Sequence, residues 1–296
     1  MIDFGTRRLD IDALRALRAI RLQGGVTRAA EALGLTQSAV SHKIKRLEVS
    51  LDCDLLSRKA GAATFTAAGE ELLEYAGRIL ELHDEALVSL TKTDLSGRIL
   101  LGLTEDTTCT DLARILGRFR RIHPQVAVRT KVRMSLVLRE LLERGELDAA
   151  IVQVFSHEVR SADIVLFREG LHWVKSRDLP MPNQDAIPFL SFDDQCFYRQ
   201  WALEVGQGGG AYLDTVFECS SAAGIVTAVN ARMGIALLSD RYISGDMEII
   251  RERLPAPPAL AYVVRRSRKT RNPALDSLIA EVEAEVNRCG GLALAS

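Results

Sequence analysis

The sequence predicts a two-part protein: a small, helix-rich winged helix-turn-helix domain, then a larger α/β region of two lobes. Three observations predict this fold class. Short amphipathic segments, interrupted at Gly24, Gly25 and Gly34, come first. A long segment with apolar residues alternately 3 and 4 positions apart follows. Beyond residue 98, apolar runs of strand length alternate with amphipathic segments, which is typical of an α/β sheet.

The composition is that of a globular protein with more than one domain. The 296 residues are 47% hydrophobic and 26% charged, and the formal net charge is -1. No apolar run approaches the roughly 20 residues needed to cross a bilayer. Residues 1–5 lack the pattern of a signal peptide. We therefore expect a cytoplasmic location and no membrane partner.

Neither a metal site, a cofactor nor a catalytic site is expected. The five cysteines are scattered without a C-x-x-C pair, and the five histidines stand singly. The sequence also lacks G-x-x-x-x-G-K-[ST], H-E-x-x-H and G-x-S-x-G, which mark three large groups of enzymes. An enzyme is therefore not predicted.

Three capped helices are predicted near the N-terminus. Asp10 is the expected cap of a helix that ends at Leu22. Thr27 and Thr36 are the expected caps of two more helices, and Gly34 between them suits a left-handed position at a helix end. The predicted ranges are 11–22, 28–33 and 37–49. Two short helices joined by such a turn form a helix-turn-helix.

The third of these helices has an apolar face and a polar face. Val40, Ile44 and Leu47 share the apolar face. The opposite face carries Gln37, Ser38, Ser41, His42 and Lys45. Because the N-terminal end of such a helix enters the major groove, we expect the first four of these residues to contact base edges. The alternative is an ordinary solvated face.

Basic residues around this helix are expected to contact phosphates, which adds affinity but little sequence information. A hairpin wing supplies two of them. Residues 55–59 change from apolar to basic, residues 60–63 form a small-residue turn, and residues 64–66 return as a strand. With Arg28 and the cap Thr36, the predicted DNA contacts outside the base-contacting set are Lys43, Lys45, Arg46, Arg58 and Lys59.

A long helix is predicted after the wing, capped by Thr66 and reaching about Thr91. Its apolar positions are spaced 3, 4, 3, 4 and 3, with one histidine among them: Leu73, Ala76, Leu80, His83, Leu87 and Leu90. We expect this stripe to pair with a second copy of the chain. His83 is either a pH-sensitive register device or a polar group tolerated at the helix crossing.

The rest of the chain alternates between strand-like and helix-like segments. The predicted strands are 99–103, 126–132, 147–152, 189–192, 216–219, 235–238 and 260–264. The predicted helices are 111–122, 136–143, 196–204, 221–231 and one that starts near 273. This alternation favours a mostly parallel sheet in two halves of similar size, with a cleft between them.

The sequence resembles the LysR-type transcriptional regulators. The resemblance rests on the residues and spacing of 24–30, 33–41, 44–48, 55–58 and 66–70, and on 145–151 and 231–238 further along. It departs in the wing, where residues 60–63 are Ala-Gly-Ala-Ala instead of more polar or basic residues. Fewer wing contacts to DNA are therefore expected.

The resemblance implies a domain organisation and a set of partners. The expected parts are a winged helix-turn-helix at 1–66, a dimerising linker helix and hinge at 67–95, and an effector-binding domain at 96–296 with the bilobed fold of periplasmic binding proteins. The implied partners are double-stranded DNA with an inverted repeat, a small-molecule effector, a second copy in a homodimer or homotetramer, and RNA polymerase. A pure solute-binding protein would need an export signal and would lack the first sixty or so residues.

Effector contacts are expected where strands end or helices begin, because helix N-termini present free N–H groups there. The candidates are Thr104, Thr107, Ser135, Cys196, Arg199, Ser220 and Ser221. Arg199 favours an anionic ligand. Glu105 and Asp106 favour a ligand with a cation or polar hydrogens, unless they face solvent, so both ligand types stay open.

Residues 196–200 also resemble the Cys-Leu-Arg-Asp-Gln stretch of peroxide-sensing members of the family. A sensor thiol needs a lowered pKa and usually a second cysteine. Arg199 is placed to lower the pKa of the Cys196 thiol, but Val205 stands where those members have the second cysteine, which leaves Cys219 as a substitute. The alternative is a pocket cysteine without a redox role.

Overall fold

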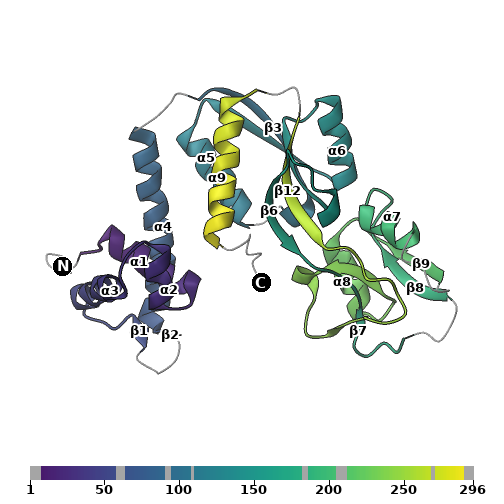
Figure 1. The fold of residues 1–296 in the computed structure, drawn as a ribbon, viewed down its shortest axis with the longest axis horizontal. Helices are drawn as coiled ribbons and strands as arrows, with labels where there is room; N and C mark the ends of the chain where they lie inside the picture. Colours follow the sequence, from purple (N-terminus) through teal and green to yellow (C-terminus); the bar gives the residue numbers. More distant parts are fainter. Residues whose placement is uncertain are drawn as a thin grey trace. The chain divides into compact units, whose positions relative to one another are not determined.

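The computed structural model describes residues 8–57, 64–90, 95–107, 110–181, 186–204, 212–267 and 271–289. The chain divides into two compact units, residues 1–93 and 94–296 (Figure 1). Within the described part, no helix combines the length and the apolar character that a membrane crossing requires.

The first unit consists of four helices and a short hairpin. The helices are α1 (Ile11–Gln23), α2 (Val26–Ala32), α3 (Gln37–Leu51) and α4 (Ala67–Leu90). The hairpin strands β1 (Leu56–Ser57) and β2 (Thr64–Phe65) pair antiparallel. This is the predicted winged helix-turn-helix, with the long helix packed against it.

Side-chain caps begin three of these helices as predicted. Asp10 accepts a hydrogen bond from the Ala13 amide at 2.8 Å, and Thr36 accepts one from the Ala39 amide at 3.2 Å. Thr66 caps α4. The prediction for α2 was wrong, because its first hydrogen bond runs from Ala29 N to Gly25 O, so the helix starts at Val26 and Thr27 lies inside it. Gly34 has the expected left-handed backbone, with φ of 64°.

The core of the first unit holds these elements together. Its fully buried side chains include Leu14, Leu17, Ile20, Val40, Ile44, Leu47 and Leu55. Gly69 permits the closest approach, because a Cβ there would lie 2.2 Å from the Leu55 carbonyl oxygen. A larger residue would therefore separate the start of α4 from the wing.

The apolar stripe of α4 does not form one intermolecular seam. Ala76 and Leu80 are 0% and 2% exposed and belong to the core shared with α1, and Leu73 packs against the same core. The part of the stripe from Leu73 to Leu80 thus packs in the core of its own domain. Leu87 and Leu90, further along, are exposed.

The second unit begins with a lobe built on a five-stranded sheet of order β4-β3-β5-β12-β6. Its strands are β3 (Gly97–Leu103), β4 (Val126–Val132), β5 (Ala149–Phe155), β6 (Ile164–Glu169) and β12 (Leu260–Arg266). Its helices are α5 (Thr110–Ile122), α6 (Ser135–Arg144) and α9 (Pro273–Cys289), with short 3-10 turns η1 (Glu105–Thr107) and η2 (Ser156–Glu158).

The helices of this lobe cover both faces of its sheet (Figure 1). Successive β5 residues point to opposite faces, because strand side chains alternate. Ile151 packs in the core that contains α5 and α9, whereas Val152 packs in the core that contains α6.

The second lobe carries the strand pair β8-β9 and the three-stranded sheet β10-β7-β11, joined by a bridge between Phe189 and Ile235. Its strands are β7 (Leu171–Ser176), β8 (Ala186–Ser191), β9 (Tyr212–Glu218), β10 (Ala236–Ser239) and β11 (Met247–Ile249). Its helices are α7 (Phe197–Glu204) and α8 (Ala222–Asn230), with the 3-10 turn η3 (Asp240–Tyr242).

The chain passes between the lobes twice, which corrects the expected mostly parallel sheet. Gly170 separates β6 from β7, and residues 250–259 lead from β11 back to β12. Because β12 returns from the second lobe, it runs antiparallel to both β5 and β6. Only the β3, β4 and β5 pairings and the β8 and β9 pairing are parallel among the described strands.

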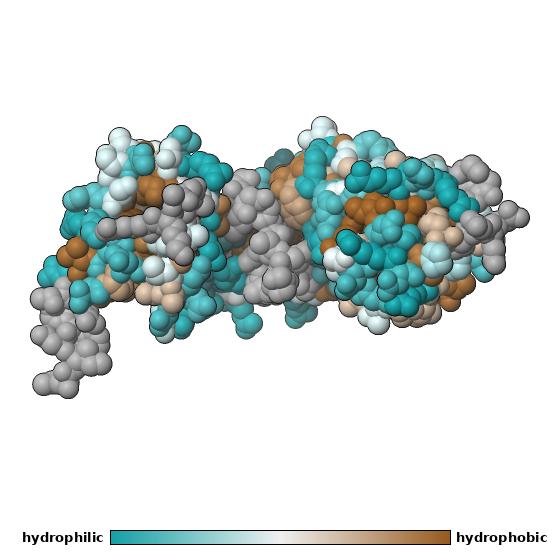
Figure 2. Space-filling model, turned by 90° about the horizontal axis from the view of Figure 1, so that it is seen from below, coloured by the Kyte–Doolittle hydropathy of each residue, from teal (hydrophilic) through white to brown (hydrophobic). Residues whose placement is uncertain are grey.

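One face of the molecule is drawn by hydropathy in Figure 2. Hydrophilic residues cover most of the described surface on that face, and hydrophobic residues form smaller patches among them. Most of the larger apolar side chains in the described chain are buried in the cores of the two units.

Candidate nucleic-acid interface and effector pocket

The N-terminal half of α3 presents the predicted base-contacting residues. Gln37, Ser38, Ser41 and His42 are all exposed, while Val40 and Ile44 on the opposite face are buried. The buried face holds the helix in the domain, and the polar face stays available to a ligand. The Thr36 hydroxyl already has partners within the chain, because it caps the helix and lies 3.0 Å from the Ser38 hydroxyl.

The predicted cations differ in their surroundings. Lys43 Nζ lies 3.2 Å from an Asp12 carboxylate oxygen, and Lys45 Nζ lies 3.4 Å from Glu48. Arg28 donates to the Gly24 carbonyl at 3.4 Å. Arg46 is exposed, and its guanidinium has no ion pair within the part of the chain that the structure describes. Arg58 and Lys59 lie outside the described residues.

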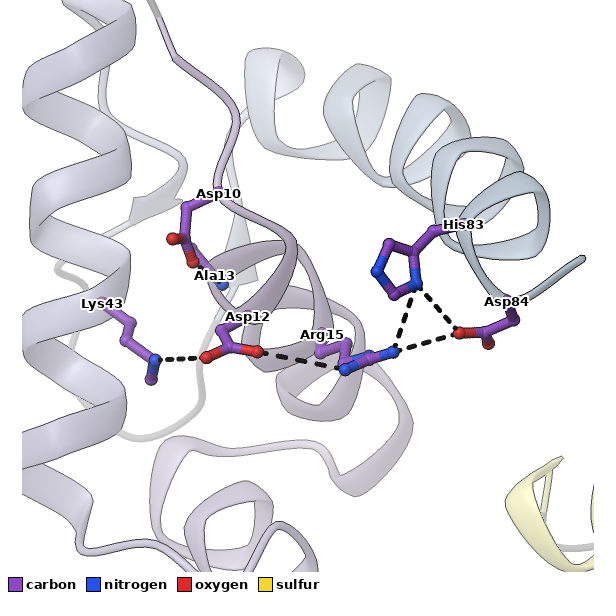
Figure 3. Close-up of polar contacts among 7 residues, drawn as sticks. All are labelled: Asp10, Asp12, Ala13, Arg15, Lys43, His83 and Asp84. Atoms are coloured by element: carbon purple, nitrogen blue, oxygen red, sulfur yellow. Dashed lines mark hydrogen bonds and ion pairs between the residues drawn. The ribbon is translucent and has the colours of Figure 1, made fainter. Parts of the chain in front are cut away.

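The contact of Lys43 is one end of a chain of charges across three helices (Figure 3). Asp12 on α1 also lies 3.9 Å from Arg15, and Arg15 donates to Asp84 on α4 at 3.0 Å. His83 Nδ1 lies 3.3 Å from the same Asp84 oxygen. The interactions therefore join the recognition helix α3, through α1, to the long helix α4.

Asp84 lies at the α4 end of this series of charged residues. Burial alone would raise the pKa of its carboxyl group, but hydrogen bonds from His83 and Arg15 outweigh burial and lower that pKa. Asp12, Arg15 and Asp84 were not predicted from the sequence, because Arg15 and Asp84 meet only once α1 and α4 pack together. His83 thus contacts Arg15 and Asp84 of its own chain.

Glu48 connects α3 to the wing. One of its carboxylate oxygens accepts from the Leu55 amide at 2.9 Å and from the Leu56 amide at 3.3 Å. The Leu55 amide precedes β1 and the Leu56 amide begins it, so the carboxylate replaces backbone partners that the chain lacks there. The contact sets the position of the wing relative to the exposed face of α3.

A small cavity of about 20 Å³ lies between the two lobes of the second unit. It is lined by Thr104, Glu105, Asp106, Met134, Ser135, Gln153, Cys196, Phe197 and Tyr198. The structure therefore brings three of the predicted effector contacts together: Thr104 and Ser135 from the first lobe, and Cys196 from the second.

The other predicted contacts lie elsewhere. Thr107 is buried, and its hydroxyl donates to the Thr104 carbonyl at 3.0 Å. Ser220 is exposed and does not line the cavity. Arg199 lies 3.1 Å from Glu218, so the expectation that it aims a free cation at an anionic ligand fails. Glu218 is the last residue of β9, and its carboxylate pairs with Arg199.

Glu105 bridges the lobes at the start of α8. One of its oxygens accepts from the Ser221 hydroxyl at 3.1 Å, and the other accepts from the Ala222 amide at 3.3 Å. A helix N-terminus attracts negative charge, and here the chain supplies that charge itself. Ser221 is thus part of an inter-lobe contact, which we call the Glu105 clasp.

A buried polar network runs beside the cavity. Arg241 donates to Glu169 at 3.0 Å, and both side chains are about nine-tenths buried. The hydroxyl of Tyr262 donates to Glu169 and accepts from Gln153. The Nη1 atom of Arg241 donates to the Asp106 carbonyl at 2.9 Å. Sequence patterns did not identify this network, because its members come from five separate segments.

The thiol of Cys196 is poorly suited to redox sensing. Burial raises the pKa of Cys196 to about 12, and the amides of Arg199 and Tyr198 do not offset that effect. The thiol therefore stays protonated at neutral pH, whereas a sensor reacts as the thiolate. Among the described residues, no group of His, Cys, Asp and Glu side chains forms a metal site.

Residues 11–70 match the bacterial regulatory helix-turn-helix proteins of the lysR family, and residues 92–287 match the LysR substrate binding domain. The chain belongs to the LysR family. It is a sequence-specific DNA-binding transcriptional regulator, and a small molecule bound in its C-terminal domain modulates its activity. The LysR proteins are regulators and not enzymes.

Curated relatives agree with this assignment. The chain is 31% identical to the HTH-type transcriptional regulator DgdR of Burkholderia cepacia over 265 residues, which cover 89% of this chain and 90% of DgdR. It is 26% identical to PecT of Dickeya dadantii over 93% of this chain and 87% of PecT. Full-length BenM shares the fold with a TM-score of 0.51 at 17% identity, covering 96% of this chain and 98% of BenM.

Proposed function

We propose that this LysR regulator recognises an inverted-repeat operator through the exposed N-terminal half of α3. The proposed base contacts are Gln37, Ser38, Ser41 and His42. The observation that supports them best is their shared exposure on a helix whose other face is buried. Side chains with hydrogen-bonding groups at this end of a recognition helix reach base edges in the major groove.

The proposed phosphate contacts surround that face. They are Arg28, Thr36, Lys43, Lys45, Arg46, Arg58 and Lys59. Arg46 is the strongest of the described ones, because no nearby carboxylate offsets its charge in the described part of the chain. Lys43 must share its charge between Asp12 and DNA. Backbone contacts of this kind add affinity and set the register of the protein on the duplex.

We propose a homo-oligomer in which α4 pairs through a face other than the predicted stripe. Tyr75 and Leu82 are 51% and 65% exposed, and Ala86 is exposed on the same side. With half-buried Ile79, their spacings of 4, 3 and 4 form a heptad face. Pairing two such helices in a dimer, or in a dimer of dimers, would present two copies of α3 to the two halves of the operator.

We propose a separate role for each of three consecutive parts of the chain. Residues 1–66 bind DNA, residues 67–95 pair and hinge, and residues 96–296 bind the effector in the inter-lobe cavity, where Thr104, Ser135 and Cys196 converge. Thr107 supports that site through its hydrogen bond to Thr104, and Ser221 supports it through the Glu105 clasp. RNA polymerase is a further proposed partner, and the cytoplasm, where DNA lies, is the proposed location.

A gel-shift assay with the DNA upstream of the protein's own gene tests the DNA proposal. Alanine at Gln37, Ser41 or His42 should relax sequence preference, by about 1–3 kcal/mol where a bidentate contact is lost. Glu31→Ala, an exposed position on α2, is the matched control. If all three variants discriminate operator from random DNA as well as the unaltered chain does, the assignment of base contacts to this face is wrong.

A further inference from the structure

One of the side chains that line the inter-lobe cavity has a buried hydroxyl group without a partner among the described residues. Tyr198 is 5% exposed and lines the cavity. Its hydroxyl oxygen is buried and has no hydrogen-bond partner among the described residues. An unpaired buried hydroxyl costs about 1–3 kcal/mol, so folded proteins seldom leave one. The group therefore marks a place for a polar partner that the described chain does not supply.

The size of the cavity limits what this partner is. A volume of about 20 Å³ is enough for about one water-sized group. An amino group meets that limit, whereas a carboxylate or phosphate, with two or more oxygens, does not. A larger ligand would place only one small polar end in this cavity, with the rest of the molecule further along the boundary between the lobes.

The charges around the cavity favour a cation. Glu105 and Asp106 line it, and Asp106 has accepting capacity beyond the bond it receives from the Tyr242 hydroxyl. The nearby cation, Arg241, is already paired with Glu169. Arg199 is paired with Glu218. Among the described residues that line the cavity, none carries a positive charge.

Two buried side chains respond to this negative field. Burial first, and then the negative charges that include Asp106 and Glu169, raise the pKa of Tyr198 well above its ordinary value. Burial, followed by the charges of Asp193 and Asp106, raises the pKa of Cys196. The Tyr198 hydroxyl is therefore neutral, and its oxygen is able to accept a hydrogen bond from a cationic N–H group.

We propose that the effector of this regulator carries an ammonium group, which sits in the inter-lobe cavity and donates hydrogen bonds to Asp106 and to the Tyr198 oxygen. This inference rests on the proposed function, in which the effector binds between the lobes. It excludes a ligand whose anchoring group is a carboxylate or a phosphate. It also gives the ligand a contact to each lobe, because Asp106 belongs to the first and Tyr198 to the second.

Three probes of similar size and different charge test the proposal: ethylammonium, ethanol and acetate. Each is titrated into the full chain at constant ionic strength, with the melting temperature and the heat of binding as readouts. Ethylammonium should raise the melting temperature saturably, because a ligand that binds the folded state stabilises it. Ethanol and acetate should leave it unchanged. Equal or stronger binding of ethanol or acetate, or no binding of ethylammonium, overturns the proposal.

Variants locate the binding. Tyr198→Phe keeps the ring and removes the hydroxyl, and Asp106→Asn keeps an acceptor for Tyr242 and removes the charge. Each should weaken ethylammonium binding by about tenfold or more. Glu140→Gln, on the exposed side of α6 beside Arg144, should not change it. Binding to Tyr198→Phe that equals binding to the unaltered chain overturns the proposal, even if Asp106→Asn fails to fold.

A gel shift without any amine separates this proposal from the proposed function. If the operator is recognised and the three probes do not differ, the ammonium proposal is wrong and the DNA assignment stands. If the operator is not recognised, the proposed DNA contacts are wrong, whatever the amine does.

Discussion

Lys43 and Arg46 lie three residues apart on α3 but have different electrostatic surroundings. The Lys43 ammonium is half-buried and lies 3.2 Å from Asp12, whereas Arg46 is exposed without such a neighbour in the described part of the chain. A cation that is already compensated attracts less counter-charge. We therefore expect Arg46 to contribute more to phosphate binding than Lys43 does.

Arg46→Gln should weaken binding to all DNA sequences alike. It should also reduce the slope of log affinity against log salt concentration by about one. Lys43→Gln, the matched loss of one positive charge, should reduce that slope less, because Asp12 already offsets the ammonium. Affinities measured over a range of salt concentrations check both values. Equal reductions by the two variants would contradict the compensating role of Asp12.

Asp84→Asn should destabilise the first unit at neutral pH and have a smaller effect in acid. The folded-state pKa of Asp84 is lowered, so its carboxylate contributes stability above the ordinary aspartate pKa of about 3.9 and loses it as pH falls further. For this partly exposed group the loss is about 0.2–1 kcal/mol. Urea unfolding at about pH 7 and about pH 3 measures it. A difference that persists unchanged at the lower pH would exclude the charge of Asp84 as its cause.

At the scale of elements, α4 has two apolar faces with different tasks. The face with Ala76 and Leu80 covers α1 and completes the core of the DNA-binding unit. The face with Tyr75 and Leu82 is exposed. Heptad spacing alone does not distinguish them, because both faces repeat at intervals of 3 and 4. Packing within one chain decides which face remains for a second chain.

Substitutions on the two faces of α4 should therefore have different consequences. Tyr75→Glu combined with Leu82→Glu should give folded monomers, because it places charges in the proposed helix pair. Leu80→Ala should leave the oligomer intact but destabilise the fold by about 2–5 kcal/mol through the cavity it creates. Sedimentation and thermal unfolding of both variants distinguish the effects. An undisturbed oligomer in the double variant would exclude the Tyr75 face from the interface.

At the scale of the whole molecule, regulation requires that the effector bind one arrangement of the lobes better than another. The Glu105 clasp belongs to such an arrangement, because it joins η1 of the first lobe to the start of α8 in the second. Arg241 and Tyr242, from η3, add contacts to Asp106 in the first lobe. These polar bonds hold the two lobes together.

Glu105→Gln should loosen the clasp. The amide keeps one acceptor for Ser221 or Ala222 but loses the negative charge at the α8 N-terminus, which is worth about 0.3–1 kcal/mol. Amide hydrogen exchange in the first turn of α8 should become faster, while exchange in β5, at the centre of the first lobe, should not change. Unchanged exchange at Ala222 would show that the clasp contributes nothing to closure of the lobes.

The sequence by itself determined the helix-turn-helix, its caps at Asp10 and Thr36, and the alternating elements of the second unit, because these depend on local spacing and cap chemistry. It also placed Thr104, Ser135 and Cys196 at the ends of elements that meet in one cavity. β6 and β7, which flank the crossing between the lobes at Gly170, were not predicted. β6 alternates weakly and has little buried surface.

Only the tertiary structure decided which charged side chains pair with one another. Arg199 was expected to meet a ligand but meets Glu218, and Glu105 was left open but binds the start of α8. Lys43 and Asp12 are 31 residues apart, and Arg15 and Asp84 are 69 residues apart. Side-chain identity states which charges a chain carries. Which charge neutralises which depends on distances of a few ångströms between distant segments, and only folding sets those distances.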